Sequence, residues 1–280
     1  MGLAAPLSAQ DEGGDPKQII VTGEALPDEA VYEFIRDIGE ETSEGQLARW
    51  EGPICPYVTG LRDGHNRYVA DTISAVAVAV GVQPADDECA VNLVVIVNSE
   101  LNRLIEELRS EQPLLFEALN PAQRSRLAEG SAPVRVWSVL DMRGSDGRRM
   151  TATDAGPPFY RSVAILSGVL PSRILRSTRV DLATTFVLLD AARLEGLNLQ
   201  QISGFVSMLA LAQLDTREPV EPDRSILNLF HNAEAPPDDL TAWDIAYLRA
   251  LYASDNRRSA SAQRGQMARM MREDLAADEE

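Results

Sequence analysis

The sequence of 280 residues contains little lysine, histidine or aromatic side chain. Lys17 is the one lysine, arginine supplies the other basic residues, and His65 and His231 are the two histidines. Acidic residues exceed basic ones, which leaves a net charge of −17. Such a surface repels phosphate backbones and anionic lipid head groups. We therefore expect neither a nucleic acid nor a membrane surface as a partner.

Long hydrophobic runs are also missing. The longest apolar stretch, residues 73–82, is shorter than the roughly 20 residues that a helix needs to cross a bilayer. We expect no membrane span. Aromatic residues make up 5% of the chain, so a core built mainly from Leu, Ile, Val and Ala is expected.

The first ten residues, MGLAAPLSAQ, resemble the end of a secretory signal, without the charged start and the longer apolar segment of a complete one. We expect residues 1–26 to be a disordered tail or the remnant of a signal peptide. Residues 27–280 are expected to form a single domain. This interpretation places the protein in the periplasm or outside the cell.

Two cysteines, Cys55 and Cys89, each stand beside a segment that resembles a strand. An even pair suits one disulfide in an oxidising compartment, and two unpaired core thiols are the alternative. No CxxC pair is present, so neither a redox motif nor a zinc cluster of cysteines is expected.

Helix-like and strand-like patterns alternate irregularly along the chain. Helices are expected over residues 27–41, 66–82, 99–111, 197–215, 240–253 and 260–276. Thr241 and Asp244 are spaced as a capping box at the start of the segment 240–253. Strands are expected over residues 92–98, 133–144 and 183–190. This order indicates an α+β fold with a mixed sheet. The helix within 197–215 is apolar on most sides, which indicates a buried central element.

The order of elements over residues 180–253 resembles the zincin metalloprotease scaffold. TTFVLLDAARLEGLNLQQISGFVSMLALAQLD resembles its strand and zinc-binding helix, SILNLF (225–230) its tight turn, and LTAWDIAYLRALYA its C-terminal helix. The resemblance implies a zincin-like sheet with a buried central helix and C-terminal helices. The chain is also similar to secreted proteobacterial proteins of unknown function.

The zinc-binding motif HExxH of that scaffold is absent. It supplies two imidazoles one helical turn apart and a glutamate beside the first. Aligned on the helix, Ser207 and Leu211 stand at the two ligand positions and Met208 at that of the glutamate. These side chains cannot hold a divalent metal or act as a general base. We therefore expect no metal, no cofactor and no zinc-dependent catalysis.

Other catalytic arrangements lack their motifs. No GxSxG elbow is present, and the two histidines stand in polar, turn-like stretches. Trp50, Tyr57, Ser207 and His231 are candidates for a binding cleft that the scaffold keeps without its zinc ligands. A peptide added along the strand that carries Trp50 and Tyr57 would be one way to fill it.

The sequence thus favours a catalytically inactive, zincin-like binding or scaffold module of the cell envelope, with a peptide or an envelope protein as partner. Two alternatives remain. One is a hydrolase with an unrecognised metal or carboxylate site, and the other is an accessory subunit of an envelope complex.

Overall fold

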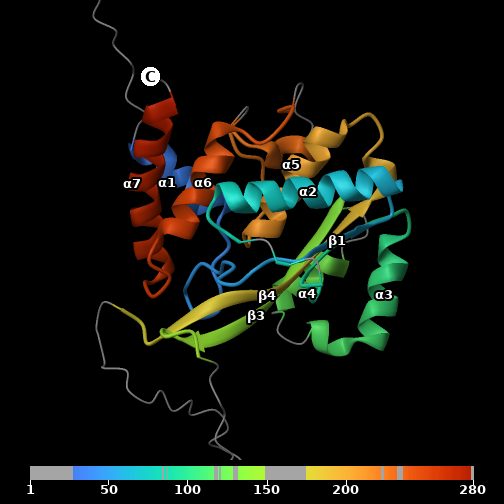
Figure 1. The fold of residues 1–280 in the computed structure, drawn as a ribbon, viewed down its shortest axis with the longest axis horizontal. Coiled ribbons are helices and arrows are strands. Elements are labelled where there is room, and N and C mark those ends of the chain that lie inside the picture. Colours follow the sequence, from blue (N-terminus) through green and yellow to red (C-terminus); the bar gives the residue numbers. More distant parts are fainter. Residues whose placement is uncertain are drawn as a thin grey trace, which may run out of the picture.

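The computed structural model describes residues 28–83, 85–86, 88–116, 119, 121–128, 132–148, 175–221, 224–231 and 236–278. The expected tail, residues 1–26, lies outside this part of the chain. The described elements form an α+β fold around a four-stranded mixed sheet. Figure 1 shows helices on both sides of that sheet.

The strands are β1 (Pro56–Thr59), β2 (Leu93–Asn98), β3 (Val134–Gly144) and β4 (Thr178–Asp190). The sheet has the order β1-β2-β4-β3. β1, β2 and β4 run parallel, whereas β3 pairs with β4 in the antiparallel direction. β3 therefore forms one edge of the sheet.

Seven α-helices accompany these strands in the described residues. They are α1 (Asp28–Ile38), α2 (Asp63–Ala79), α3 (Leu101–Glu111), α4 (Pro121–Ala128), α5 (Leu199–Leu211), α6 (Ala242–Ala253) and α7 (Ala260–Asp278). Short 3-10 helices are η1 (Pro113–Phe116), η3 (Ala191–Arg193) and η4 (Ile226–Phe230). In Figure 1, α1, α6 and α7 gather at one end, while α2 runs across the sheet.

Two hydrophobic clusters cover the two faces of the sheet. The larger one joins α1, α2, α5, α6 and α7 to one face, and the smaller one joins α3, η1 and α4 to the other. Side chains of β2 alternate between the two clusters, with Leu93 and Val95 in the larger and Val94 and Ile96 against the smaller. This alternation follows from the two-residue period of a strand. The prediction that residues 92–98 form a strand covered on both faces is confirmed.

α5 is the central helix of the larger cluster. Every residue from Gln201 to Leu211 is buried, as its nearly uniform apolar character predicts. The helix begins with a capping box in which Asn198 accepts from the Gln201 backbone N–H and Gln201 accepts from that of Asn198. The expected start at residue 197 was therefore close, and the expected end at 215 was four residues too late. The helix ends at Leu211, and the next residues turn into an extended segment.

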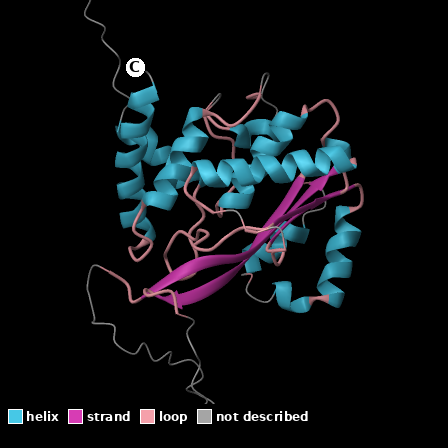
Figure 2. Cartoon of the chain, viewed as in Figure 1, coloured by secondary structure: helices cyan, strands magenta, loops and turns pink. Residues whose placement is uncertain are grey.

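β4 begins five residues earlier than its expected start at 183. Arg179 and Asp181 are polar residues within the strand, paired in register with Arg143 and Asp141 of β3. Ion pairs join Asp181 to Arg179 and Arg143 at 3.0 and 3.6 Å. The pairing of β3 with β4 continues past the two shorter strands, and the ion pair of Asp181 with Arg143 links the two strands there (Figure 2).

Cys55 and Cys89 form a disulfide that joins the start of β1 to the segment before β2. The expectation that the two cysteines form a disulfide is confirmed. None of the described helices is long and apolar enough to cross a membrane.

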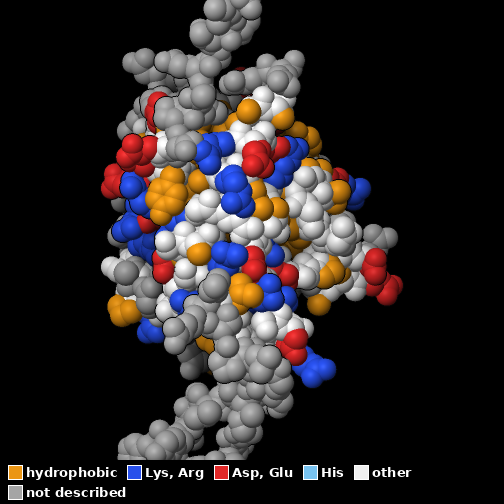
Figure 3. All heavy atoms as spheres, turned by 90° about the vertical axis from the view of Figure 1, so that its left-hand side faces the viewer, with side chains coloured by type: hydrophobic (Ala, Val, Ile, Leu, Met, Phe, Trp, Pro, Cys, Tyr) orange, Lys and Arg blue, Asp and Glu red, His pale blue; other side chains and the backbone are white. Residues whose placement is uncertain are grey.

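The end of the molecule that carries α1 and α7 has a mixed surface. Acidic and basic side chains are interspersed there, and the apolar side chains drawn in colour are scattered (Figure 3). This face therefore shows neither a broad apolar patch nor a field of one charge, despite the overall excess of acidic residues.

Candidate functional site

A cavity of about 470 Å³ lies beside β3, between that strand, α4 and the C-terminal end of α5. β3 and the residues before it contribute 132–138, α4 contributes 123, 126 and 127, and the segment after α5 contributes 212–217. η4 and His231 close another side. The walls come from segments far apart in the sequence, so the cavity exists only in the folded protein.

One wall of the cavity is the free edge of β3. The Asp190 N–H of β4 donates to the Pro133 carbonyl at 2.9 Å, which shows that Pro133 faces β4. Backbone groups of successive strand residues point to alternate sides. The register therefore turns the N–H and C=O groups of Val136 and Ser138 away from β4, toward the edge. No described residue outside the sheet forms a backbone hydrogen bond with them.

The opposite wall is apolar and aromatic. The rings of Phe205 and Phe230 meet edge to face with their centroids 5.0 Å apart. Leu227 of η4 lies beside them and is almost fully buried. An apolar side chain that entered this part of the cavity would be buried from water. Its burial would stabilise the complex by about 25 cal/mol per Å² of apolar surface.

Two buried polar atoms of cavity-lining residues lack a hydrogen-bond partner. They are the indole N–H of Trp137 and the side-chain carbonyl oxygen of Gln213. Trp137 is 4% exposed, because its ring stacks between those of Phe116 and Phe186. A buried donor and a buried acceptor without partners are costly in a folded protein.

Ion pairs close the charged rim of the cavity. Arg126 of α4 contacts Glu40 at 2.5 Å, and Arg217 pairs with Asp215 through its guanidinium. Burial raises the pKa of Asp215, but hydrogen bonds from the side chain and backbone of Arg217 outweigh this effect and lower it below its ordinary value. Each rim carboxylate thus has a guanidinium partner, and the rim offers no free acid.

Helix α6 holds η4 in place against the cavity. Asp244, which is fully buried, accepts hydrogen bonds from the Ser225 hydroxyl at 2.5 Å and from the Ile226 N–H at 2.9 Å. The same carboxylate accepts from the backbone and hydroxyl of Thr241, which completes the capping box predicted from the sequence. Burial raises the pKa of Asp244, and these four hydrogen bonds oppose the rise.

The three residues at the degenerate zinc positions do not line this cavity. Ser207, Met208 and Leu211 are all fully buried, and the Ser207 hydroxyl donates to the Ser203 carbonyl at 2.7 Å. Phe205 is the residue of α5 that reaches the cavity.

The four residues considered for a binding cleft are not brought together. His231 lines the cavity beside β3, and one of its ring nitrogens, Nε2, lies 2.9 Å from the Thr216 carbonyl. Trp50 is buried elsewhere and donates to the Ala210 carbonyl at 2.8 Å. Tyr57 lies on β1, at the opposite edge of the sheet, and is 51% exposed. Ser207 is in the core. Of the four, only His231 stands at the cavity described here.

Sequence reasoning missed Trp137, Phe205, Gln213 and Phe230 as cavity residues. Trp137 lies in the alternating segment 133–144, but such a pattern does not tell an edge strand from a central one. Within the described residues, no three His, Cys, Asp or Glu side chains lie close enough together to hold a metal ion.

The arrangement combines a strand edge that has no backbone partner among the described residues with an aromatic wall. These are features of a site that binds a chain segment. In comparisons with protein-family models, curated proteins and solved structures, nothing matches this chain.

Proposed function

We propose that this protein is a binding module that holds an extended peptide in the cavity beside β3 and does not cleave it. The observation that carries the proposal is the position of the cavity along a strand edge. The backbone groups of Val136 and Ser138 point into that edge without a partner among the described residues. An extended peptide would add to the sheet there by backbone hydrogen bonds.

Specificity would come from the side chains of the bound segment. Alternate residues of an extended peptide point to the same side, about 6–7 Å apart. One apolar side chain would pack against Phe205 and Phe230.

We further propose that the scaffold is a zincin-like one that lacks zinc chemistry. What supports this is the order of elements: strand β4 leads into the buried helix α5, the short turn η4 follows, and α6 comes after it. At the positions aligned with the zinc-binding motif, Ser207, Met208 and Leu211 are core residues. The disulfide fits the expected place of action, in the periplasm or outside the cell.

Selection from a random peptide library, followed by affinity measurement on the enriched sequences, tests the proposal. Val136→Pro removes the N–H that the peptide would use and keeps the bonds to β4, because this N–H faces the open edge. Val136→Ala is the matched control, since it shortens the same side chain and keeps the N–H. We expect Val136→Pro to bind the selected peptides at least about fivefold more weakly than Val136→Ala.

Mass spectrometry of the same library after long incubation checks for cleavage. Equal affinities of the two variants would contradict strand addition at β3. Cleaved peptides would contradict the non-catalytic part of the proposal and favour the hydrolase alternative.

A further inference from the structure

A second cavity, which shares the lining residue Leu127 of α4 with the first, supports a separate inference. This inference does not depend on the peptide proposal. The second cavity has a volume of about 450 Å³ and lies where the end of α3, η1 and α4 meet. Its lining residues are Arg109, Pro113, Leu114, Phe116, Arg124 and Leu127. They comprise two arginines and four apolar residues, and no described acidic side chain is among them. This composition is unusual in a chain with a net charge of −17.

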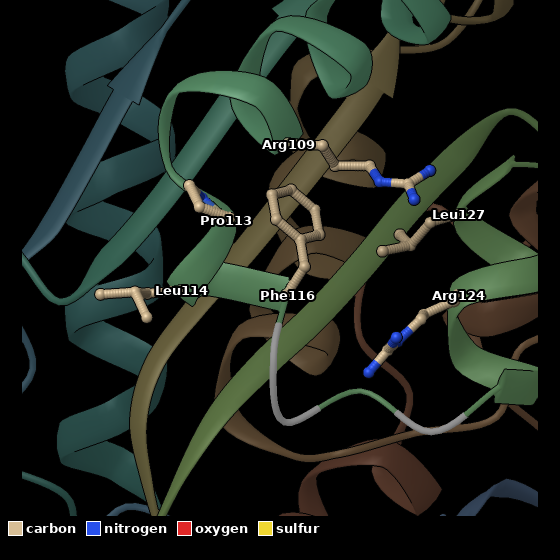
Figure 4. A pocket seen from close by; sticks show the side chains of 6 residues that line it. All are labelled: Arg109, Pro113, Leu114, Phe116, Arg124 and Leu127. Carbon is tan, nitrogen blue, oxygen red and sulfur yellow. The ribbon is translucent and has the colours of Figure 1, made fainter.

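The two arginines come from different helices. Arg109 lies in the last turn of α3, and Arg124 lies in α4. Figure 4 shows their side chains extending from the two helices, with Leu127 between them and Phe116 to one side in this view. The Arg124 Nε donates to the Leu119 carbonyl at 2.8 Å, which orients its guanidinium.

Arg109 has no ion-pair partner on its own helix. Arg103, two turns earlier on α3, pairs with Glu100 at 3.1 Å and with Glu107 at 2.9 Å. Arg109 forms no hydrogen bond or ion pair with any described residue. None of its five donor N–H groups is used by a described residue.

The floor of the cavity is apolar. Phe116 and Leu127 are 7% and 5% exposed, and the ring of Phe116 stacks on Trp137 with a centroid distance of 5.1 Å. Leu114 stands at the rim and is 75% exposed. A ligand that covered Leu114 would remove this surface from water.

We propose that this cavity binds a small soluble organic anion with an apolar body. The anionic group, a carboxylate in the simplest case, lies against Arg109 and Arg124, where charge-assisted hydrogen bonds are strongest. The apolar body packs on Phe116 and Leu127 and covers Leu114. An aromatic carboxylate fits both requirements, and a cavity of this volume is within the range of small-molecule sites.

Titration calorimetry with 4-phenylbutanoate tests the proposal, and 4-phenylbutanamide serves as the neutral ligand of the same shape. We expect the amide to bind at least about tenfold more weakly than the carboxylate, because it lacks the charge. Arg109→Ala should weaken binding of the carboxylate about fivefold to tenfold and leave the amide unchanged. Arg109 is exposed and unpaired in the described structure, so the substitution should not disturb folding.

Arg103→Ala is the matched control on the same helix, because it also removes one exposed positive charge. It should leave the affinity within about twofold of that of the unaltered protein. Leu114→Ser, at an exposed site, should weaken both ligands severalfold. Affinity of the carboxylate should also fall as salt is added.

Equal losses in Arg103→Ala and Arg109→Ala would overturn the proposal, since attraction to α3 in general would then explain binding. Binding that Arg109→Ala leaves unchanged would overturn the proposal too, because the ligand would then lie away from Arg109. No binding at millimolar ligand would also overturn it. The proposal would also be overturned if the protein bound anionic phospholipid vesicles through Arg109 but did not bind free 4-phenylbutanoate. The ligand would then be a lipid surface. None of these outcomes bears on the peptide proposal, which Val136→Pro tests separately.

Discussion

Gly60 and Gly81 share a left-handed backbone but differ in their surroundings. Gly60 follows β1 at φ +97°, and a Cβ added there would stand 1.9 Å from the Val97 carbonyl oxygen. Gly81 follows α2 at φ +91°, and a Cβ there would meet nothing within 4 Å. Substitution of Gly81 therefore tests backbone strain alone, whereas substitution of Gly60 adds a steric clash.

We expect Gly81→Ala to lower the free energy of unfolding by about 1–2 kcal/mol, the cost of a left-handed residue with a side chain. Gly60→Ala should cost at least about 3 kcal/mol, because the strands β1 and β2 must also separate. Urea denaturation measures both. Similar losses in the two variants would contradict the close approach of Gly60 to β2.

The Asp215 carboxyl at the rim of the peptide cavity provides a test by pH. Burial raises its pKa, while hydrogen bonds from Arg217 lower it further than burial raises it. Because the folded-state pKa is lowered, the stabilisation is present above the unfolded pKa near 3.9 and is lost as the pH falls through the folded value.

We expect Arg217→Ala to raise the pKa of Asp215 and to remove this acid-dependent part of the stability. Carbon-detected NMR titration of the side-chain carboxyl measures the change. Arg257→Ala, which removes a comparable partner of Asp255, should leave Asp215 unaffected. An unchanged pKa of Asp215 in Arg217→Ala would show that the pair does not persist in solution.

At the scale of elements, the junction of η4 and α6 depends on one buried carboxylate. Asp244 caps its own helix and also holds Ser225 and the Ile226 N–H of η4. The spacing of Thr241 and Asp244 predicted the capping box. It did not predict the bonds to η4, because those join residues 18 and 19 positions apart.

We expect Asp244→Ala to lower the free energy of unfolding by about 2–4 kcal/mol, since it leaves several buried donors without an acceptor. Asp244→Asn should cost less. The amide oxygen can still accept from the N–H groups, and the amide nitrogen can donate to the Ser225 hydroxyl oxygen. Urea denaturation of both variants checks this order, and a larger loss in Asp244→Asn would contradict it.

The strands show what a local hydrophobic pattern can and cannot predict. The short apolar run at residues 92–98 predicted β2 and its burial on both faces. The start of β4 was placed too late, because Arg179 and Asp181 read as polar residues outside a strand. Asp181 forms an ion pair with Arg143 of β3 and another with Arg179 of its own strand, so both charges are neutralised within the β3–β4 ribbon. A pattern of single residues cannot show which partner will neutralise a charge.

At the scale of the whole molecule, the disulfide encloses β1 and α2 in one loop. Cys55 and Cys89 are 34 positions apart in the sequence. Closing a loop of this length restricts the unfolded chain and stabilises the folded protein by roughly 3–4 kcal/mol.

We expect Cys55→Ser together with Cys89→Ser to lower the free energy of unfolding by that amount, measured by urea denaturation without reductant. The unaltered protein measured in reductant should lose a similar amount. If the double variant is as stable as the oxidised protein, the disulfide does not constrain the unfolded chain.

The sequence by itself determined the class of the fold, the position of most helices, the buried character of α5 and the capping box of α6. These features depend on periodicity and on contacts between near neighbours along the chain. Only the tertiary structure decided which strand lies at the edge and which residues line the two cavities. It moved Trp50 into the core, where its indole N–H meets a carbonyl 160 residues away, and it left Ser207 buried. Such contacts depend on the packing of distant segments against one another, and no local pattern encodes them.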